Sequence, residues 1–189
     1  MSLRNALLLL TITFACGCST YRPPPTPEHA DNAVDLNEPF DRVWSNLIDC
    51  VSGTYFGIET HERASGLITL SFGLANPSQF VTGGYFKSGR VNFEGDYVDY
   101  LTQLWSGRLT GKMNIVAKDL GNSRTRLTVN AVYTFSAVFP DGTDTWSFDS
   151  RQCATNRVTN PSAGTSATRT ICPTGKAEKD IIKCTAGLS

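Results

Sequence analysis

Residues 109–138 read LTGKMNIVAKDLGNSRTRLTVNAVYTFSAV, and this stretch decides the fold. Apolar and polar residues alternate along both halves, which are joined by Gly-Asn-Ser-Arg at residues 121–124. Alternation of this kind predicts a strand with one apolar face, and a short connection containing Gly and Asn favours a hairpin turn. We therefore predict an antiparallel hairpin of two strands, over residues 109–120 and 125–138.

Shorter stretches on both sides of this hairpin predict further strands. Residues 55–61 and 67–72 alternate and are separated by a short turn, which indicates a second hairpin. After a turn at residues 140–143, Trp146 and Phe148 alternate along one more strand. The strands are therefore expected to form an antiparallel sheet.

Two long segments show no regular alternation. Residues 73–104 are rich in glycine and aromatic side chains but have no clean period, so we expect an irregular excursion with at most a short strand or helical turn. Residues 154–170 are rich in Ser, Thr, Asn, Gly and Pro, which favours a surface loop.

Helices are predicted at both ends of the domain. In residues 40–51 the apolar side chains recur at the spacing of one helix face, with Asn37 as a candidate cap and Gly53 as a stop. Residues 176–188 contain a second apolar stripe. With the strands, these helices indicate a single α+β domain over residues 36–189, in which an antiparallel sheet of about five strands has the N-terminal and C-terminal helices packed on one face.

Residues 1–17 are predicted to be a targeting signal. Arg4 is followed by an apolar core over residues 6–15, which fits the length of a secretory h-region. A helix that spans a membrane would need about 20 apolar residues. The segment is therefore expected to be removed on export and to take no part in the fold.

The end of this signal resembles the lipobox of bacterial lipoproteins, in which small residues precede a cysteine that receives diacylglycerol before the signal is cut off. Cys18 fits best because Ala15 and Gly17 are small, and Cys16 is the alternative acceptor. An ordinary secretory signal cut near Ala15 is the other interpretation. Ser19 stands where retention in the inner membrane typically requires Asp, so the resemblance implies an anchor in the outer membrane, on its periplasmic side.

Residues 18–35 follow as a polar, proline-rich stretch. Such a stretch favours an extended chain that buries no core, so we predict a lipidated tether between membrane and domain. Two or more acyl chains would hold the protein stably to a bilayer. Loss of Arg4 with the signal leaves 16 of the 17 basic residues against 17 acidic ones, so no strong field favours nucleic acid as a partner.

A resemblance to a known family supports the predicted fold. Residues 40–72, FDRVWSNLIDCVSGTYFGIETHERASGLITLSF, resemble the opening of small bacterial lipoprotein domains related to the helix-grip domains of the β-barrel assembly machinery lipoprotein C. Residues 172–178, CPTGKAE, resemble a closing segment of small bacterial outer-membrane lipoproteins. The resemblance spans most of residues 36–188 and implies a helix-grip-like fold, whereas the aromatic excursion at residues 73–104 departs from that plan.

The cysteines that follow the signal are Cys50, Cys153, Cys172 and Cys184. An even number in an exported chain predicts two disulfides, for which three connectivities exist. The pair Cys153 and Cys172 is favoured because its bond would clamp the segment between them, which leaves Cys50 and Cys184 to join the two helices. Two buried free thiols remain the alternative for that second pair. No pair has the C-x₂₋₄-C spacing of a zinc site, so we expect no bound metal.

Residues that could carry chemistry are sparse. The chain has two histidines, and His29 falls in the predicted tether. His61 shares a predicted strand face with Glu59, which suits a solvated face better than an acid–base or metal pair, because further converging ligands are missing. The G-x-S-x-G, S-x-x-K, H-E-x-x-H and P-loop patterns are absent. We therefore predict no catalytic residues, no cofactor and no enzymatic activity.

The excursion contains a group of aromatic residues that could serve binding. If they gather on the surface they would form a patch for a protein partner, whereas the alternative is that they cover the exposed sheet face as core. The residues concerned are Phe80, Tyr85, Phe86, Phe93 and Tyr97.

The leading functional hypothesis is a lipid-anchored envelope protein of structural or protein-interaction type. The alternative is a periplasmic carrier, in which sheet and helices enclose a lipid or a cell-wall fragment. An envelope enzyme, which would need catalytic side chains brought together only by the fold, ranks last.

Overall fold

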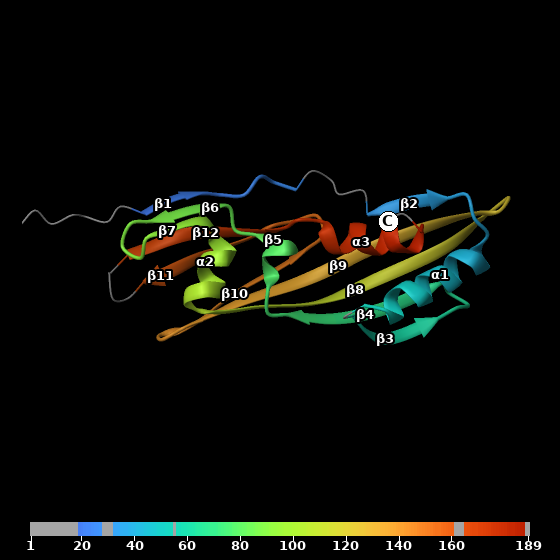
Figure 1. Cartoon of the computed structure of the whole chain (residues 1–189), viewed down its shortest axis with the longest axis horizontal. Coiled ribbons are helices and arrows are strands. Elements are labelled where there is room, and N and C mark those ends of the chain that lie inside the picture. Colours follow the sequence, from blue (N-terminus) through green and yellow to red (C-terminus); the bar gives the residue numbers. More distant parts are fainter. Residues whose placement is uncertain (1–18, 28–31, 55, 161–164, 188–189) are drawn as a thin grey trace, which may run out of the picture.

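The computed structural model describes residues 19–27, 32–54, 56–160 and 165–187, and shows an elongated α+β molecule with three α-helices and mostly antiparallel strands (Figure 1). Its longest elements are β8 (Ser106–Gly121) and β9 (Arg124–Phe139), with 16 residues each. At about 3.3 Å per residue such strands reach roughly 50 Å. The other elements are arranged along this hairpin (Figure 1).

The hairpin predicted from residues 109–138 is confirmed and extends further at its open end. Its register runs from Ser106 opposite Val138 to Gly121 opposite Arg124. The two turn residues, Asn122 and Ser123, both have a φ of 53°. Positive φ at both central positions is the geometry that matches the twist of a two-residue hairpin.

The hairpin belongs to a six-stranded sheet, in which five strands follow the order β10-β9-β8-β4-β3 and the sixth, β2, pairs with β9. The strands β3 (Gly57–Glu62) and β4 (Leu67–Leu74) form the second predicted hairpin, and β10 (Gly142–Asp149) is the strand predicted after the 140–143 turn. The short strand β2 (Ala33–Leu36) pairs with β9 beyond the end of β10.

Two helices cover one half of the inner sheet face. Helix α1 (Phe40–Ser52) packs against β8 and against α3 (Lys176–Thr185), which in turn packs on β9. Helix α1 begins directly after Pro39 and has no side-chain cap, so the prediction that Asn37 caps it is wrong. The helix predicted over residues 176–188 ends at Thr185, three residues earlier than expected. Gly187 takes a positive φ of 67°, a conformation that commonly ends a helix.

The other half of the sheet is covered by elements from the excursion and from both chain ends. Helix α2 (Tyr97–Leu104) and the short 3₁₀ helix η1 (Pro77–Gln79) lie there beside two small sheets. One sheet has the order β1-β6-β7 and consists of β1 (Ser19–Arg22), β6 (Tyr85–Ser88) and β7 (Phe93–Asp96). The other has the order β11-β12-β5 and consists of β11 (Ala154–Asn160), β12 (Thr165–Pro173) and β5 (Val81–Thr82).

These small sheets correct three expectations. The prediction of a single sheet of about five strands, helix-grip-like, is wrong, because three sheets are present. The segment 154–170 is a hairpin and not a loop, since β-branched residues such as Thr suit strands even in a polar sequence. The segment predicted as a tether contains β1 and β2, because β1 pairs with the edge of β6 and β2 pairs with the edge of β9.

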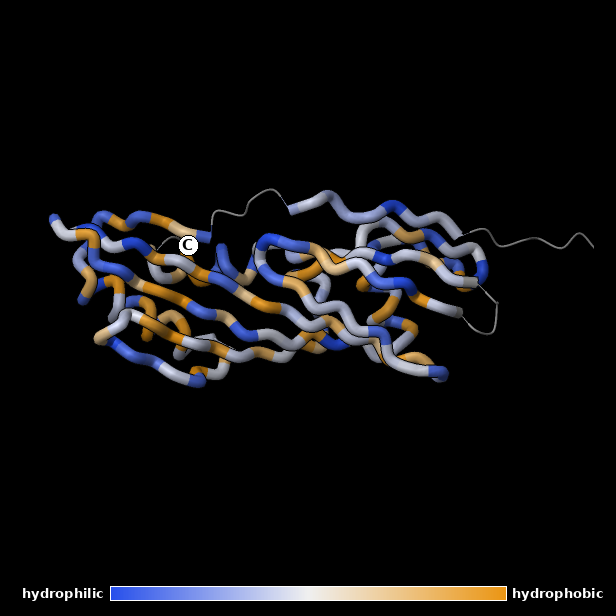
Figure 2. The backbone as a smooth tube through the Cα atoms, turned by 180° about the vertical axis from the view of Figure 1, so that it is seen from behind, coloured by the Kyte–Doolittle hydropathy of each residue, from blue (hydrophilic) through white to orange (hydrophobic). Residues whose placement is uncertain are grey.

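A single hydrophobic core runs along the inner face of the six-stranded sheet. Figure 2 shows hydrophobic and hydrophilic residues alternating along the long strands. The largest fully buried side chains include Trp146, Tyr133 and Phe135, all from β9 and β10. The outward side chains of β8, such as Thr110, Lys112 and Asn114, are exposed.

Two disulfides connect distant parts of the chain. Cys50–Cys184 joins α1 to α3 across 134 residues of sequence, and Cys153–Cys172 closes the β11–β12 hairpin across 19 residues. These are the pairings that the sequence favoured.

Loss of Cys50–Cys184, which closes the longer loop, is expected to destabilise the protein more than loss of Cys153–Cys172. In the chain-entropy model, replacing Cys50 and Cys184 by alanine should lower the free energy of unfolding by about 5 kcal/mol, and replacing Cys153 and Cys172 by about 3 kcal/mol. Urea denaturation of the two double variants measures both losses. A larger loss for the Cys153 and Cys172 variant would contradict this ranking.

Candidate functional site

The strand that follows the predicted lipidation position is part of the fold. Cys16 and Cys18 lie outside the described residues, and the description begins at Ser19, which is the first residue of β1. Ser19 pairs with Ser88, and Arg22 pairs with Tyr85. The chain is therefore held to the body of the protein from the residue next to Cys18 onward.

A cation–π cluster fixes β1 from the neighbouring sheet. The Arg169 guanidinium of β12 lies 4.3 Å from the centre of the Tyr21 ring, 5.5 Å from that of Phe86 and 5.2 Å from that of Tyr97. The Tyr21 hydroxyl accepts a hydrogen bond from the Thr170 amide at 2.9 Å and donates one to the Thr170 carbonyl at 3.3 Å. A cation above several aromatic faces is attracted by each of them.

The aromatic residues of the excursion do not form a surface patch. Phe86 and Tyr97 are buried, and with the half-buried Phe93 and Tyr100 they form edge-to-face and stacked contacts between β6, β7 and α2. Burial raises the pKa of the Tyr97 hydroxyl. The predicted partner surface is therefore wrong for this group, because the side chains are the core that joins the small sheet to α2.

The remaining two residues of that predicted surface are Phe80 and Tyr85. Phe80 is buried, with the Lys176 ammonium 5.9 Å from its ring centre. Tyr85 is half-buried and donates a hydrogen bond to Glu94 at 2.9 Å. The Lys87 ammonium also bonds Glu94, at 2.6 Å, and the hydrogen bonds from Lys87 and Tyr85 lower the pKa of the Glu94 carboxyl.

Replacement of Arg169 should release β1 while leaving the rest of the fold intact. In Arg169→Met the side chain keeps its length but loses the charge above the aromatic rings, so the amides of β1 should exchange faster with deuterium. Hydrogen–deuterium exchange followed by mass spectrometry measures this change. Arg157→Met on the neighbouring strand β11 is the matched control, and equal exchange in both variants would show that the cluster does not hold β1.

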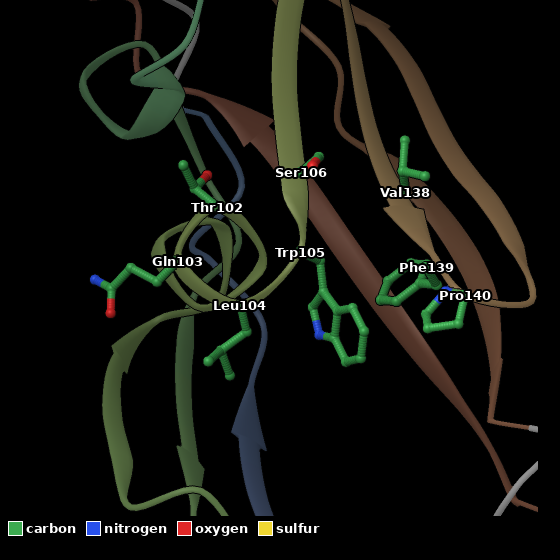
Figure 3. A pocket seen from close by; sticks show the side chains of 8 residues that line it. All are labelled: Thr102, Gln103, Leu104, Trp105, Ser106, Val138, Phe139 and Pro140. Carbon is green, nitrogen blue, oxygen red and sulfur yellow. The ribbon is translucent and has the colours of Figure 1, made fainter.

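A groove lies at the end of the molecule where α2 meets β8 and where β9 ends (Figure 3). Its volume is about 460 Å³. Trp105 and Phe139 lie side by side in it with ring centres 5.3 Å apart, while Leu104 and Val138 are 45% and 51% exposed. The lining residues are Thr102, Gln103, Leu104, Trp105, Ser106, Val138, Phe139 and Pro140. Sequence reasoning missed this cluster, although Leu104 and Trp105 form an apolar pair at the end of α2.

Among the described residues, the acidic and histidine side chains do not converge on one site. His61 and Glu59 lie on the exposed edge strand β3, and Glu59 forms an ion pair with Lys112 at 2.9 Å. In the part of the chain that is described, no group of three or more His, Cys, Asp or Glu side chains could hold a metal ion. Near the groove, burial and the neighbouring Asp141 carboxylate raise the pKa of Asp144.

One carboxyl group is fully inside the protein. Glu178 of α3 is 1% exposed, and its Oε1 accepts a hydrogen bond from the Tyr133 hydroxyl at 2.9 Å. Its Oε2 has no hydrogen-bond partner. A catalytic acid or base must reach a substrate, and this side chain is closed off between α3 and the sheet. The pair therefore serves the packing of α3.

Removal of the Tyr133 hydroxyl should destabilise the protein. Tyr133→Phe leaves Glu178 Oε1 without this hydrogen bond in a buried place, which costs about 1–3 kcal/mol of unfolding free energy. The midpoint of urea denaturation reports the loss. Tyr100→Phe, which removes a hydroxyl from a half-buried ring, is the control; a similar midpoint for the two variants would contradict the role of the pair.

Comparisons with known proteins add no relative. No protein-family model, no curated protein and no solved structure matches this chain. None of the helices in the described ranges has the length and hydrophobicity needed to span a membrane.

Proposed function

We propose that this chain is the precursor of a lipid-anchored envelope protein that faces the periplasm from the outer membrane and has a structural or protein-binding role. Residues 1–17 would be the export signal, and Cys18 the lipidated residue, with Cys16 as the alternative. The role needs no catalytic centre and no cofactor.

The distribution of the cysteines carries this proposal. All four cysteines of the domain are paired in two disulfides, which persist in oxidising compartments such as the periplasm. Cys16 and Cys18 stand apart from them, at the end of an apolar leader. A thiol kept out of the disulfide framework and placed after small residues is suited to acylation.

The shape of the domain supports binding to another protein. The six-stranded sheet is covered on its inner face only, and its outer face presents exposed polar side chains along β8. The edge strand β3 is exposed along its whole length. An open sheet face and a free strand edge are surfaces on which a protein partner can dock by side-chain contacts or by strand addition.

The carrier alternative would place a lipid or cell-wall fragment between helices and sheet. The inward side chains there, such as Leu70, Met113 and Ile115, have no exposed surface. The groove near Trp105 lies instead at the end of the molecule. A binding role on the outer surface therefore has more support than a carrier role.

Metabolic labelling with radioactive palmitate tests the anchor. The wild-type chain and Cys16→Ala should incorporate the label and fractionate with the outer membrane, whereas Cys18→Ala should not incorporate it, because the acylated thiol is missing. The Cys16→Ala variant is the matched control, two residues away in the same leader. A wild-type protein without label, recovered from the soluble periplasm, would refute the lipid anchor.

A further inference from the structure

The position of β1 determines where an acylated N-terminus would leave the domain. Ser19 is the first residue of β1 and lies opposite Ser88, beside the β6–β7 turn. Consecutive Cα atoms are about 3.8 Å apart, so Cys18 is within one residue length of this strand end. An acyl chain on Cys18 would start at this end of the molecule.

The groove near Trp105 lies at the same end. Figure 1 shows the start of β1, the β6–β7 turn, the last turn of α2 and the β9–β10 turn together at one end of the elongated molecule, and Figure 2 shows the same grouping from behind. Leu104 ends α2 and Trp105 follows it, and Phe139 and Pro140 lead into the β9–β10 turn. In Figure 3 the side chains of Trp105, Phe139 and Pro140 lie next to one another.

These residues differ from the other exposed apolar side chains of the described surface in that they are grouped around one groove. Large exposed apolar side chains elsewhere, such as Val116 and Val132, are single residues on a polar sheet face. At this end, Leu104 and Val138 are exposed beside the ring pair of Trp105 and Phe139, and Val91 in the β6–β7 turn is 45% exposed. Contiguous exposed apolar side chains mark a contact surface, and Trp suits the boundary between lipid and water.

We propose that this end face, formed by Leu104, Trp105, Val138, Phe139 and Pro140, rests in the lipid–water interface of the membrane that holds the acylated N-terminus. The inference rests on the proposed function, because the lipid on Cys18 brings the end face to the bilayer. The Arg169 cluster holds β1 in place, so the anchor is not a free tether and the end face stays next to the membrane.

This contact would orient the whole molecule. The β8–β9 hairpin runs from the end face to the opposite end, where α1 and α3 lie (Figure 1). With the end face on the membrane, the hairpin projects from the bilayer over a length of roughly 50 Å. The disulfide-linked helices and the open sheet face would then be presented to partners in the periplasm.

Quenching of tryptophan fluorescence by brominated lipids tests the contact. The lipidated full-length protein is reconstituted in vesicles of phosphatidylethanolamine and phosphatidylglycerol, part of which has brominated acyl chains. Trp44 and Trp146 are buried, whereas Trp105 is half-buried at the end face. Emission should be quenched in the wild type and in Trp44→Phe, and the quenching should be lost in Trp105→Phe.

A charge at the end face should also break the contact. Val138→Glu should lose the quenching of Trp105, while Val132→Glu, an equally exposed valine on the same strand β9, should keep it. Both variants should retain the wild-type urea midpoint, because both side chains face solvent. Equal quenching in the wild type and in Trp105→Phe would overturn the proposal.

The palmitate label separates this inference from the proposed function. A labelled protein whose Trp105 is not quenched would keep the lipid anchor but refute the membrane contact. An unlabelled protein would refute both, because the end face would then have no anchor to bring it to the bilayer.

Discussion

The packing of the inner face of the β8–β9 hairpin is the constraint on which the rest of the structure depends. Each strand has 16 residues, and the inward side chains from Leu109 to Phe135 are buried. Strands of this length reach roughly 50 Å. Helix α1, with 13 residues, is only about 20 Å long, so it cannot cover such a face even together with the shorter α3 lying beside it. A second covering layer is required, and the excursion and the segment 154–173 supply it.

The two halves of this covering layer are stabilised by different interactions. On one half, Cys50–Cys184 joins α1 to α3, and the buried contact of Glu178 with Tyr133 joins α3 to β9. On the other half, an arginine from β12 and aromatic rings from β1, β6 and α2 pack together. Residues from the two ends of the chain meet there, since Tyr21 bonds the backbone of Thr170. Strand β1 is thereby made part of the fold.

This arrangement links the structure to the proposed role. A lipid anchor on a long flexible tether would leave the orientation of a domain free. Here β1 begins at Ser19 and is paired over its whole length, and its first residue lies at the same end of the molecule as the end of α2 and the β9–β10 turn. With the end face on a bilayer, the open sheet face and the edge strand β3 would lie along the side of the projecting hairpin, where a protein partner could reach them.

The sequence by itself determined the hairpin at residues 109–138 and both terminal helices, and its four domain cysteines favoured the two disulfide pairings. These follow from alternation, helical spacing and cysteine count, which depend on neighbours in the chain. Only the tertiary structure decided that residues 19–22, 154–160 and 165–173 are strands, that Phe86 and Tyr97 are core, and that Trp105 meets Phe139. Those outcomes depend on which unpaired edges and uncovered apolar faces the long hairpin offers, and a polar or glycine-rich segment carries no local signal of the partner that will pair with it.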